Sequence, residues 1–557
     1  MTDSATPPQP RPLGRREFLT RAGVGGLVIG LGGVAAGELA SAAPAASAAS
    51  FGFTSSGGFF TITTGAGLVF KIHQSTGGMT SLNINGTELQ PSGTNESHVE
   101  SGIPSPTVTA QQTGNFIIIT ASTSTWYGSG PLRHYYVAVN GQNNVYMATY
   151  VGSAGEVRWI QYLNRNILTN INTPSDINGG TTIESKDIFL VNGQTRSKYY
   201  SNRQAMNLTP RGVTGSGIGV YMAYGLRESS SGGPFFRDIE QQGTGASVEV
   251  YNYMWSGHND TEPQRLGVLY GPYALMVAGT STPAAPDMSF MYNFGFAGSV
   301  APSGRGFVSG TASGVAGGVG VTVGWASSQA QYWTALPSNG NFTSPAMKPG
   351  TYTQTLYQGE LGVATRTVTV NAGSTTSGQN IASAWFTPAS PIFRIGTWDG
   401  TPSGFLNSAN LTFMHPSDTR MAHWGPITYT VGSSSAQFPA YTWKAINNPT
   451  TVRFTLSSGQ IAARTVRIGI TAAYAGGRPQ ITVNNWASPG PGASAQPNSR
   501  SLTIGTYRGN NALYTYNVPA SAFVAGTNTM TITVLSGSGG LGGYLSPGYS
   551  YDCVEMY

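Results

Sequence analysis

Short stretches of alternating apolar and polar residues recur along the chain from about residue 51 onward. Four clear examples are Asn115–Ser122, Val248–Trp255, Thr451–Leu456 and Thr529–Leu535. A period of two places successive side chains on opposite faces of an extended chain, so each stretch predicts a β-strand. We find no convincing helical periodicity in this part of the sequence. The pattern predicts an almost entirely β protein.

Asn-Gly pairs separate several of these stretches. They occur at Asn85-Gly86, Asn140-Gly141, Asn192-Gly193 and Asn339-Gly340. The two central residues of a type I′ turn need positive φ, which Asn and Gly adopt most readily. The pairs therefore predict tight hairpins between antiparallel strands.

Composition supports a folded β protein. Glycine supplies 76 of 557 residues, charged residues 9% and aromatic residues 11%. Soluble domains average about 25% charged residues, so the low charge argues against coiled coils and helical bundles. The aromatic content argues against disorder, because it supplies apolar surface for a core.

The net charge of +6 is spread thinly over the chain. No Lys/Arg cluster follows the N-terminus, which argues against nucleic-acid binding. A weak positive field suits an acidic small molecule or a polyanion. Cys553 is the single cysteine, so no intramolecular disulfide can form, and no Cys/His cluster has zinc-site spacing.

Residues 1–50 are expected to be a twin-arginine signal peptide and processing region. Arg15 and Arg16 precede a weakly apolar, Gly-rich run, and an Ala/Ser-rich stretch follows. The alternative, a membrane anchor, is disfavoured because the run is short and Glu38 interrupts it. We therefore expect export, an extracellular location and a mature chain that begins between Ala43 and Phe51.

Two shifts in composition divide the remaining chain into three regions. They fall near residue 301 and near residue 388, and give regions of residues 51–301, 302–388 and 389–557. The middle region has the size of an immunoglobulin-like sandwich. The last fits a jelly roll, and the first is large enough for a large two-sheet sandwich.

The strand Val248–Trp255 carries a candidate binding surface. Alternation places Glu249, Tyr251, Tyr253 and Trp255 on one face, with His258 just beyond the strand. Exposed aromatic rings can stack on sugar rings, and an imidazole nearby can transfer a proton. Cross-strand packing of the aromatic residues, with a turn histidine, is the alternative.

Lys198 and Arg158 are further candidates. Lys198 is one of five lysines and precedes Tyr199 and Tyr200, and burial of a lysine favours a role as a base. Arg158 can hold a carboxylate with two hydrogen bonds. The alternative for Lys198 is a surface lysine that extends past the aromatic rings, and the alternative for Arg158 is a structural ion pair.

The other five histidines are interpreted as structural: His73, His98, His134, His415 and His423.

Several segments together resemble the rhamnogalacturonan endolyases of polysaccharide lyase family four. In the first region they are Thr195-Arg-Ser-Lys-Tyr-Tyr-Ser, Gly233-Pro-Phe-Phe-Arg-Asp, Tyr253-Met-Trp-Ser-Gly-His258, Thr261-Glu-Pro and Gly271-Pro-Tyr. Later in the chain they are Lys348-Pro-Gly-Thr-Tyr, Gly396-Thr-Trp-Asp-Gly, Tyr507-Arg-Gly-Asn-Asn and Tyr551-Asp552. Their number and order make the resemblance specific, and it covers the chain from about Phe51 to the C-terminus.

The resemblance implies three β-sandwich domains and a β-elimination reaction. The domains are a large galactose-mutarotase-like sandwich, a fibronectin-III-like sandwich and a carbohydrate-module-like jelly roll. Lys198 and His258 match the catalytic pair, and Arg158, Tyr251 and Tyr253 match residues of the substrate cleft. The implied substrate is the acidic polysaccharide rhamnogalacturonan I. We expect a monomer that needs no metal or other cofactor and contacts neither nucleic acid nor membrane.

Two other functions fit the same residues. A non-catalytic carbohydrate-binding protein would be all-β, glycine-rich and aromatic as well. A glycoside hydrolase would need two carboxylates across the bond, and Glu249, Asp260 and Glu262 lie near the strand. For a lyase, we assign Lys198 as base and His258 as acid. The reverse assignment, or a tyrosine as one partner, remains open from the sequence.

Overall fold

The computed structural model describes residues 50–93, 96–412, 415–416, 418, 424–497 and 499–557. The predicted export segment lies outside the described residues, apart from Ser50, and so does His423. Among the described residues, every helix is a short 3₁₀ turn and all other regular structure is strand. The prediction of an almost entirely β protein is confirmed. No helix in this part of the chain is long and apolar enough to cross a membrane.

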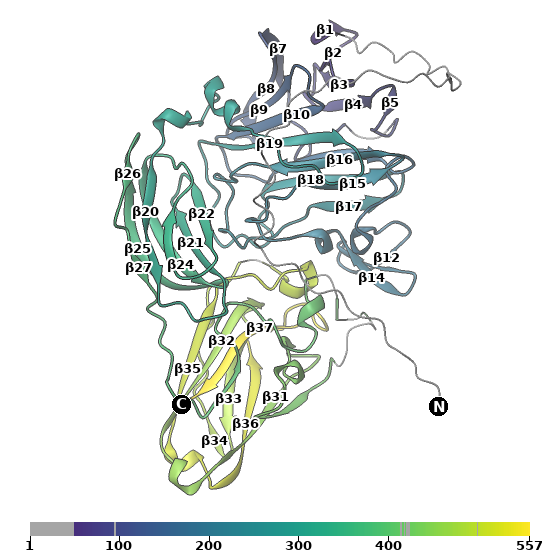
Figure 1. Cartoon of the computed structure of the whole chain (residues 1–557). Helices are drawn as coiled ribbons and strands as arrows, with labels where there is room; N and C mark the ends of the chain where they lie inside the picture. The colour runs from purple at the N-terminus through teal and green to yellow at the C-terminus, as the bar shows by residue number, and fades with distance from the viewer. Residues whose placement is uncertain (1–49, 94–95, 413–414, 417, 419–423, 498) are drawn as a thin grey trace, which may run out of the picture. The chain divides into compact units, whose positions relative to one another are not determined.

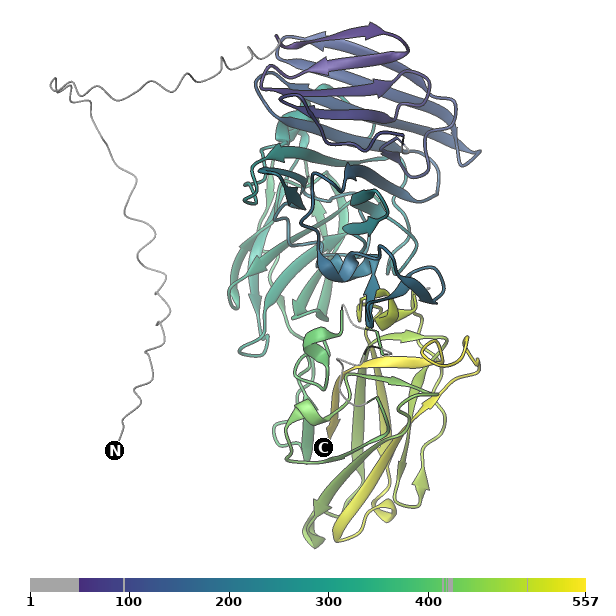
Figure 2. The ribbon, with the colours of Figure 1, turned by 90° about the vertical axis from the view of Figure 1, so that its right-hand side faces the viewer.

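Four sheets make up the first region; Figure 1 labels strands of each, and Figure 2 shows the same region turned by 90°. The five-stranded sheet contains, in spatial order, β1 (Gly52–Ser56), β2 (Phe59–Thr63), β3 (Leu68–His73), β4 (Met79–Ile84) and β5 (Thr87–Glu88). The seven-stranded sheet contains β15 (Arg211–Gly215), β16 (Ile218–Tyr224), β19 (Val268–Ala278), β10 (Asn144–Val151), β9 (Gly130–Val139), β8 (Phe116–Trp126) and β7 (Thr107–Thr113).

Two smaller sheets of this region carry the candidate site. The four-stranded sheet contains β17 (Gln241–Thr244), β18 (Ser247–Trp255), β11 (Val157–Asn164) and β6 (His98–Val99). The three-stranded sheet contains β12 (Thr181–Glu184), β13 (Ile188–Val191) and β14 (Gln194–Ser197). The 3₁₀ helices of the region are η1 (Thr173–Ser175), η2 (Lys198–Ser201) and η3 (Ser289–Phe294).

The second region is built on two further sheets. One contains β23 (Gly340–Thr343), β20 (Phe307–Ser313) and β26 (Thr375–Thr376), with β27 (Ile381–Ala382) also paired to β20. The other contains β22 (Gln331–Leu336), β21 (Val321–Ala326), β24 (Gly350–Gln358) and β25 (Leu361–Val370). The short helix η4 (Pro302–Gly304) precedes β20.

The third region is another pair of sheets. One contains β28 (Phe393–Gly396), β37 (Gly548–Met556), β32 (Arg464–Tyr474) and β35 (Ala512–Val518), with β30 (Tyr441–Trp443) also paired to β37. The other contains β29 (Ile427–Thr430), β31 (Thr450–Leu456), β36 (Gly526–Leu535), β33 (Arg478–Val483) and β34 (Trp486–Ala487). Its 3₁₀ helices are η5 (Ser408–Asn410), η6 (Ser435–Gln437), η7 (Ser458–Gln460), η8 (Ser501–Ile504) and η9 (Ala520–Ala522).

The local predictions hold at the strands and at two of the turns. The four alternating stretches fall on β8, β18, β31 and β36. Asn85 and Gly86 join β4 to β5 with φ of 50° and 88°, and Asn192 and Gly193 join β13 to β14 with φ of 49° and 76°. These positive values at both central residues are those of type I′ turns.

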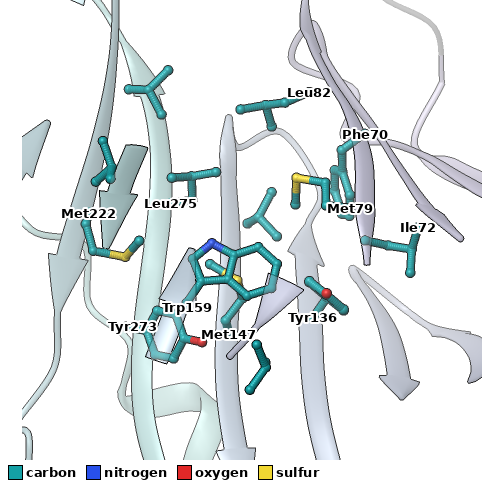
Figure 3. Close-up of a cluster of buried hydrophobic side chains, with 14 of the residues drawn as sticks. Phe70, Ile72, Met79, Leu82, Tyr136, Met147, Trp159, Met222, Tyr273 and Leu275 are labelled. Carbon is teal, nitrogen blue, oxygen red and sulfur yellow. The ribbon is translucent and has the colours of Figure 1, made fainter. Parts of the chain in front are cut away.

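Each region has its own hydrophobic core, as expected for three sandwiches. In the first region the core lies between the larger sheets, and Figure 3 shows Trp159 of β11 among Tyr136, Met147 and Tyr273. Trp159 is completely buried. Because neighbouring residues of a strand face opposite sides, burial of Trp159 turns Arg158 to the outer face of the sheet.

Candidate active site

Arg158 and two predicted tyrosines lie side by side on the four-stranded sheet. Strands β11 and β18 pair antiparallel, with Arg158 opposite Tyr253 and Ile160 opposite Tyr251. The Arg158 guanidinium lies 5.4 Å from the centre of the Tyr253 ring, and its Nη1 donates a hydrogen bond to the Tyr253 hydroxyl. Strand pairing thus places a cation and a phenol on the same patch of surface.

Trp255 does not share the face of the two tyrosines, contrary to the prediction. The register of β18 against β11 shifts between Tyr253 and Trp255, with one extra residue on β18. Such a β-bulge interrupts the alternation of side chains. Trp255 consequently packs against the core of the first region, together with Met254.

The tyrosine face is also not an exposed platform. Tyr251 and Tyr253 are only 7% and 4% exposed. They belong to a cluster that we call the tyrosine cluster, which consists of Ile160, Tyr199, Ile239, Tyr251, Tyr253 and Ile504. Side chains from η2 and from η8 of the third region cover the rings. The prediction of an open stacking surface is therefore wrong for the free protein.

The three-stranded sheet places Lys198 beside an acid. The turn at Asn192-Gly193 sets Ile188 opposite Ser197, so the next pair outward is Asp187 and Lys198. The Lys198 Nζ lies 2.9 Å from Asp187 Oδ1 and 5.5 Å from the centre of the Tyr199 ring. The lysine side chain is 25% exposed. Lys198 is therefore not buried among aromatic rings as expected, but forms a partly exposed ion pair with Asp187.

His258 lies in the loop that follows β18. Its Nδ1 is 3.2 Å from Asp238 Oδ1, and its ring centre is 5.5 Å from that of Tyr199 and 5.6 Å from that of Tyr253. Burial lowers the pKa of His258, but the Asp238 and Glu156 carboxylates together raise it by more, so the net shift is upward. The neighbouring Asp238 therefore favours a protonated His258.

Further carboxyl groups surround Arg158 and His258. Glu156 Oε1 lies 3.0 Å from Arg158 Nη1, and Glu100 Oε1 lies 3.9 Å from Nη2. Burial raises the pKa of Glu156 despite the nearby guanidinium. Burial, with the charge of Asp238, raises the pKa of Asp260 to about 7. Any acidic ligand of Arg158 must compete with Glu156 for the guanidinium.

Arg158 lines a cleft of about 710 Å³, whereas Lys198, Tyr251, Tyr253 and His258 are not among its lining residues. Its walls include Glu96, His98, Glu100, Arg158 and Tyr162. The cleft is large enough for a substrate that extends beyond the reacting sugar.

The structure brings all five predicted site residues into one neighbourhood through the contacts given above. Sequence reasoning missed the acids that accompany them, Asp187, Asp238 and Glu156. Asp187 could have been found from the register of the Asn192-Gly193 hairpin. Asp238 ends the segment that begins at Gly233, but nothing in the sequence indicates that it contacts His258.

Two of the three carboxylates considered for a hydrolase, Glu249 and Glu262, are engaged elsewhere, and the third, Asp260, accepts a hydrogen bond from the backbone nitrogen of Gly257 at 2.5 Å. Glu249 is buried, and its Oε1 accepts hydrogen bonds from Thr244 Oγ1 at 2.7 Å and Ser247 Oγ at 2.6 Å. Glu262 pairs with Arg265 at 2.7 Å. Neither is arranged as a partner of the other across a bound sugar.

Comparison with known families matches nearly the whole chain after residue 50. Residues 51–298 match the family described as rhamnogalacturonan lyase B, N-terminal. Residues 304–378 and 391–556 match domains II and III of polysaccharide lyase family 4.

Individual relatives agree with these matches. A protein named "Probable rhamnogalacturonate lyase A" from Aspergillus fumigatus is 48% identical over 91% of this chain and 96% of its own length. Rhamnogalacturonate lyase A of Aspergillus aculeatus is 46% identical over the same shares. Among solved structures, the extracellular domain of ANXUR2 from Arabidopsis thaliana covers 82% of this chain and 89% of its own, at 10% identity. Its TM-score of 0.15 is too low to bear on the fold.

Identity near half over nine-tenths of the chain is decisive for family membership. The chain belongs to the rhamnogalacturonate lyases of polysaccharide lyase family 4, and it is a polysaccharide lyase.

Proposed function

We propose that this protein cleaves the rhamnose-(1,4)-galacturonate bonds of rhamnogalacturonan I by β-elimination. The observation that carries the proposal is the pairing of Lys198 with Asp187 and of His258 with Asp238, close to Arg158. The names of the relatives support rhamnogalacturonan as the substrate class.

The elimination begins with removal of the proton at C5 of galacturonate. Lys198 takes this proton, and the C5–H electrons form the C4=C5 double bond. Burial raises the pKa of Asp187, but Lys198 and Arg500 lower it by more, so Asp187 is a carboxylate. That carboxylate stabilises the ammonium that forms on Lys198 as the proton arrives.

The C4–O4 bond breaks as the double bond forms, and the leaving oxygen needs a proton. His258 donates it from the nitrogen that does not face Asp238. Arg158 holds the galacturonate carboxylate and stabilises the negative charge that develops beside it. Tyr251 and Tyr253 contribute to the wall of the site that holds the substrate. The products are an unsaturated galacturonate and a chain that ends in rhamnose.

We also propose that catalysis needs no metal ion, because Arg158 supplies the positive charge at the substrate carboxylate. The twin-arginine segment supports export and an extracellular site of action on the polysaccharide. We propose that the exported enzyme acts as a monomer.

Incubation with rhamnogalacturonan I, followed by ultraviolet absorbance and by reducing-end assay, tests the reaction. A lyase produces a conjugated uronide that absorbs in the ultraviolet, a hydrolase produces reducing ends without that absorbance, and a binding protein produces neither. His258→Ala is the matched negative control, because its position in a loop leaves no large core cavity. Reducing ends without absorbance would overturn the proposal.

A further inference from the structure

A second cleft lies apart from the candidate active site, where parts of all three regions meet. It has a volume of about 430 Å³, within the usual range for small-molecule sites. Among the residues that line it are Glu262, Tyr357, Trp385, Trp398, Arg508 and Asp552. We call it the junction cleft. Its lining includes none of Arg158, Lys198, Tyr251, Tyr253 and His258.

The junction cleft contains a buried cation without an anionic partner. Arg508 is 8% exposed, and its Nη1 donates to the backbone oxygen of Glu360 at 2.9 Å. Among the residues that the structure describes, no carboxylate oxygen lies within 4.0 Å of its nitrogens. A buried charge is costly unless a partner compensates it, so this guanidinium is suited to an anionic ligand.

The nearest acid, Glu360, is already neutralised by another cation. Its Oε1 accepts from Arg237 Nη2 at 2.8 Å, and its Oε2 accepts from Arg237 Nη1 at 3.3 Å. Tyr507 and Gln204 also donate to Oε1, at 2.9 and 2.8 Å. Glu360 also attracts Arg508, but beyond ion-pair distance, because its carboxylate accepts from Arg237, Tyr507 and Gln204 instead.

The other acids of the junction cleft do not change this balance. Glu262 is paired with Arg265. Asp552 is 2% exposed, and burial, together with nearby Asp399, raises its pKa and favours its neutral form. The cleft thus presents one unpaired positive charge.

Aromatic and amide groups complete a surface suited to a sugar. Trp385 and Tyr357 are partly exposed and line the cleft, whereas Trp398 is only 4% exposed and packs beside Trp385, with ring centres 5.2 Å apart at an angle of 53°. Asn510 and Asn511 also line the cleft, and the side-chain oxygen of Asn511 has no hydrogen-bond partner within the described part of the chain. Aromatic faces bind the C–H faces of sugar rings, and amides bind hydroxyl groups.

We propose that the junction cleft is an accessory site for a uronic acid residue, with Arg508 on its carboxylate. Trp398 and Arg508–Asn511 of the cleft lie in two segments that the catalytic mechanism leaves without a role, Gly396–Gly400 and Tyr507–Asn511. Where the proposed function holds, the ligand is a galacturonate of the same polymer. The accessory site then holds the chain in addition to the catalytic centre.

Calorimetric titration with monomeric galacturonate tests this directly, because the monosaccharide has no bond to cleave and is not consumed. Galactose is the neutral control of matched ring geometry. We expect galacturonate to bind at least about tenfold more tightly than galactose, and Arg508→Gln to lose at least about tenfold in affinity. On the polymer, Arg508→Gln is expected to raise KM and leave kcat unchanged.

A matched pair of variants at the exposed Leu513 tests the site even if Arg508→Gln does not fold. Leu513 lines the cleft and is 42% exposed, so both Leu513→Glu and Leu513→Gln are expected to fold. The added carboxylate in Leu513→Glu should repel galacturonate, whereas Leu513→Gln should bind it almost as the parent protein does.

His258→Ala separates this site from the catalytic one, and it should bind galacturonate normally even if the proposed reaction is wrong. Three results would overturn the accessory site. The first is no detectable binding of galacturonate to the parent protein. The second is that folded Arg508→Gln and both Leu513 variants bind galacturonate as tightly as the parent protein does. The third is loss of galacturonate binding in His258→Ala.

Discussion

At the scale of single residues, each proposed proton-transfer group contacts one carboxylate. Lys198 is paired with Asp187, and His258 with Asp238, at 2.9 and 3.2 Å. A carboxylate beside a base stabilises the positive charge that the base gains when it takes up a proton. A carboxylate beside a protonated acid stabilises that acid and so slows release of its proton. The same type of neighbour therefore affects the two steps in opposite directions.

Substitution of Lys198 distinguishes a base from a holder of the substrate carboxylate. We expect Lys198→Arg to lose turnover by about a hundredfold or more, nearly as much as Lys198→Ala. Arginine can keep the pairing with Asp187 but stays protonated, so it cannot accept the proton. Initial rates of ultraviolet absorbance measure the loss, with the exposed Lys71→Arg as control. A Lys198→Arg variant that retains most of its kcat would make the lysine a carboxylate clamp and leave His258 or a tyrosine as base.

The pH profile of Asp238→Asn reveals the protonation state in which His258 works. Asp238 raises the pKa of His258, so the substitution should lower that pKa. If protonated His258 is the acid, activity falls as pH rises through its pKa, and the alkaline limb of kcat/KM should move to lower pH. If His258 is instead the base, it is the acidic limb that should move to lower pH. An unchanged profile would exclude His258 from both roles.

At the scale of elements, the third region braces the sheet that presents Lys198. Arg500 Nη1 lies 3.0 Å from Glu184 Oε1, and Arg500 Nη2 also contacts Asp187. Thr195 donates to Asp418 through its backbone nitrogen and its hydroxyl, at 3.1 and 2.7 Å. The hairpin β12–β14 is thus fixed at both ends by groups that come from more than 200 residues later in the chain.

Loss of this brace should affect turnover more than binding. We expect Arg500→Gln to lower kcat by about tenfold or more and to change KM less, because freed Asp187 no longer fixes Lys198. Small displacements of a reacting group can cost up to about a hundredfold in rate. Steady-state kinetics on rhamnogalacturonan measure both constants, with exposed Arg453→Gln as control. A rise in KM at unchanged kcat would instead place Arg500 on the substrate.

At the scale of the whole molecule, buried ion pairs join the regions. Glu228 of the first region accepts from Arg305 Nη1 and Nη2 at 2.7 and 3.0 Å and from the Tyr332 hydroxyl at 2.7 Å. Lys348 Nζ lies 3.4 Å from the same carboxylate. Burial raises the pKa of Glu228, but these partners lower it by more. The carboxylate therefore stays charged between two cations.

Neutralising this carboxylate should destabilise the protein. We expect Glu228→Gln to cost about 3 kcal/mol of unfolding free energy, because it leaves Arg305 and Lys348 buried without an anion. Scanning calorimetry should show a clearly lower melting temperature. Asp287→Asn, at an exposed position, should change stability by no more than about 0.5 kcal/mol. A melting temperature equal to that of the parent would mean that the pairing contributes nothing to stability.

Removal of divalent cations should leave turnover unchanged. A guanidinium cannot be chelated, so if Arg158 provides the charge at the substrate carboxylate, excess chelator has no target in the reaction. Rates are compared before and after dialysis against chelator, with a melting curve to detect any change in folding. Loss of activity that calcium restores, with the melting curve unchanged, would refute the proposal.

The sequence by itself determined the strands, the tight turns and the residues of the site. Alternation located β18, and the type I′ geometry of Asn192-Gly193 fixes the register that sets Lys198 beside Asp187. These features depend on interactions between near neighbours in the chain, which the local pattern contains. The resemblance then singled out Arg158, Lys198, Tyr251, Tyr253 and His258, which lie together in the structure.

Only the tertiary structure decided exposure and charge pairing. The β-bulge that removes Trp255 from the tyrosine face needs the register of β11 against β18. The burial of Tyr253 depends on Ile504, and the second ion pair of Asp187 is with Arg500, both of which come from the third region. All these contacts join residues that lie far apart in the chain. Periodicity describes only neighbours in the chain, so no local pattern contains them.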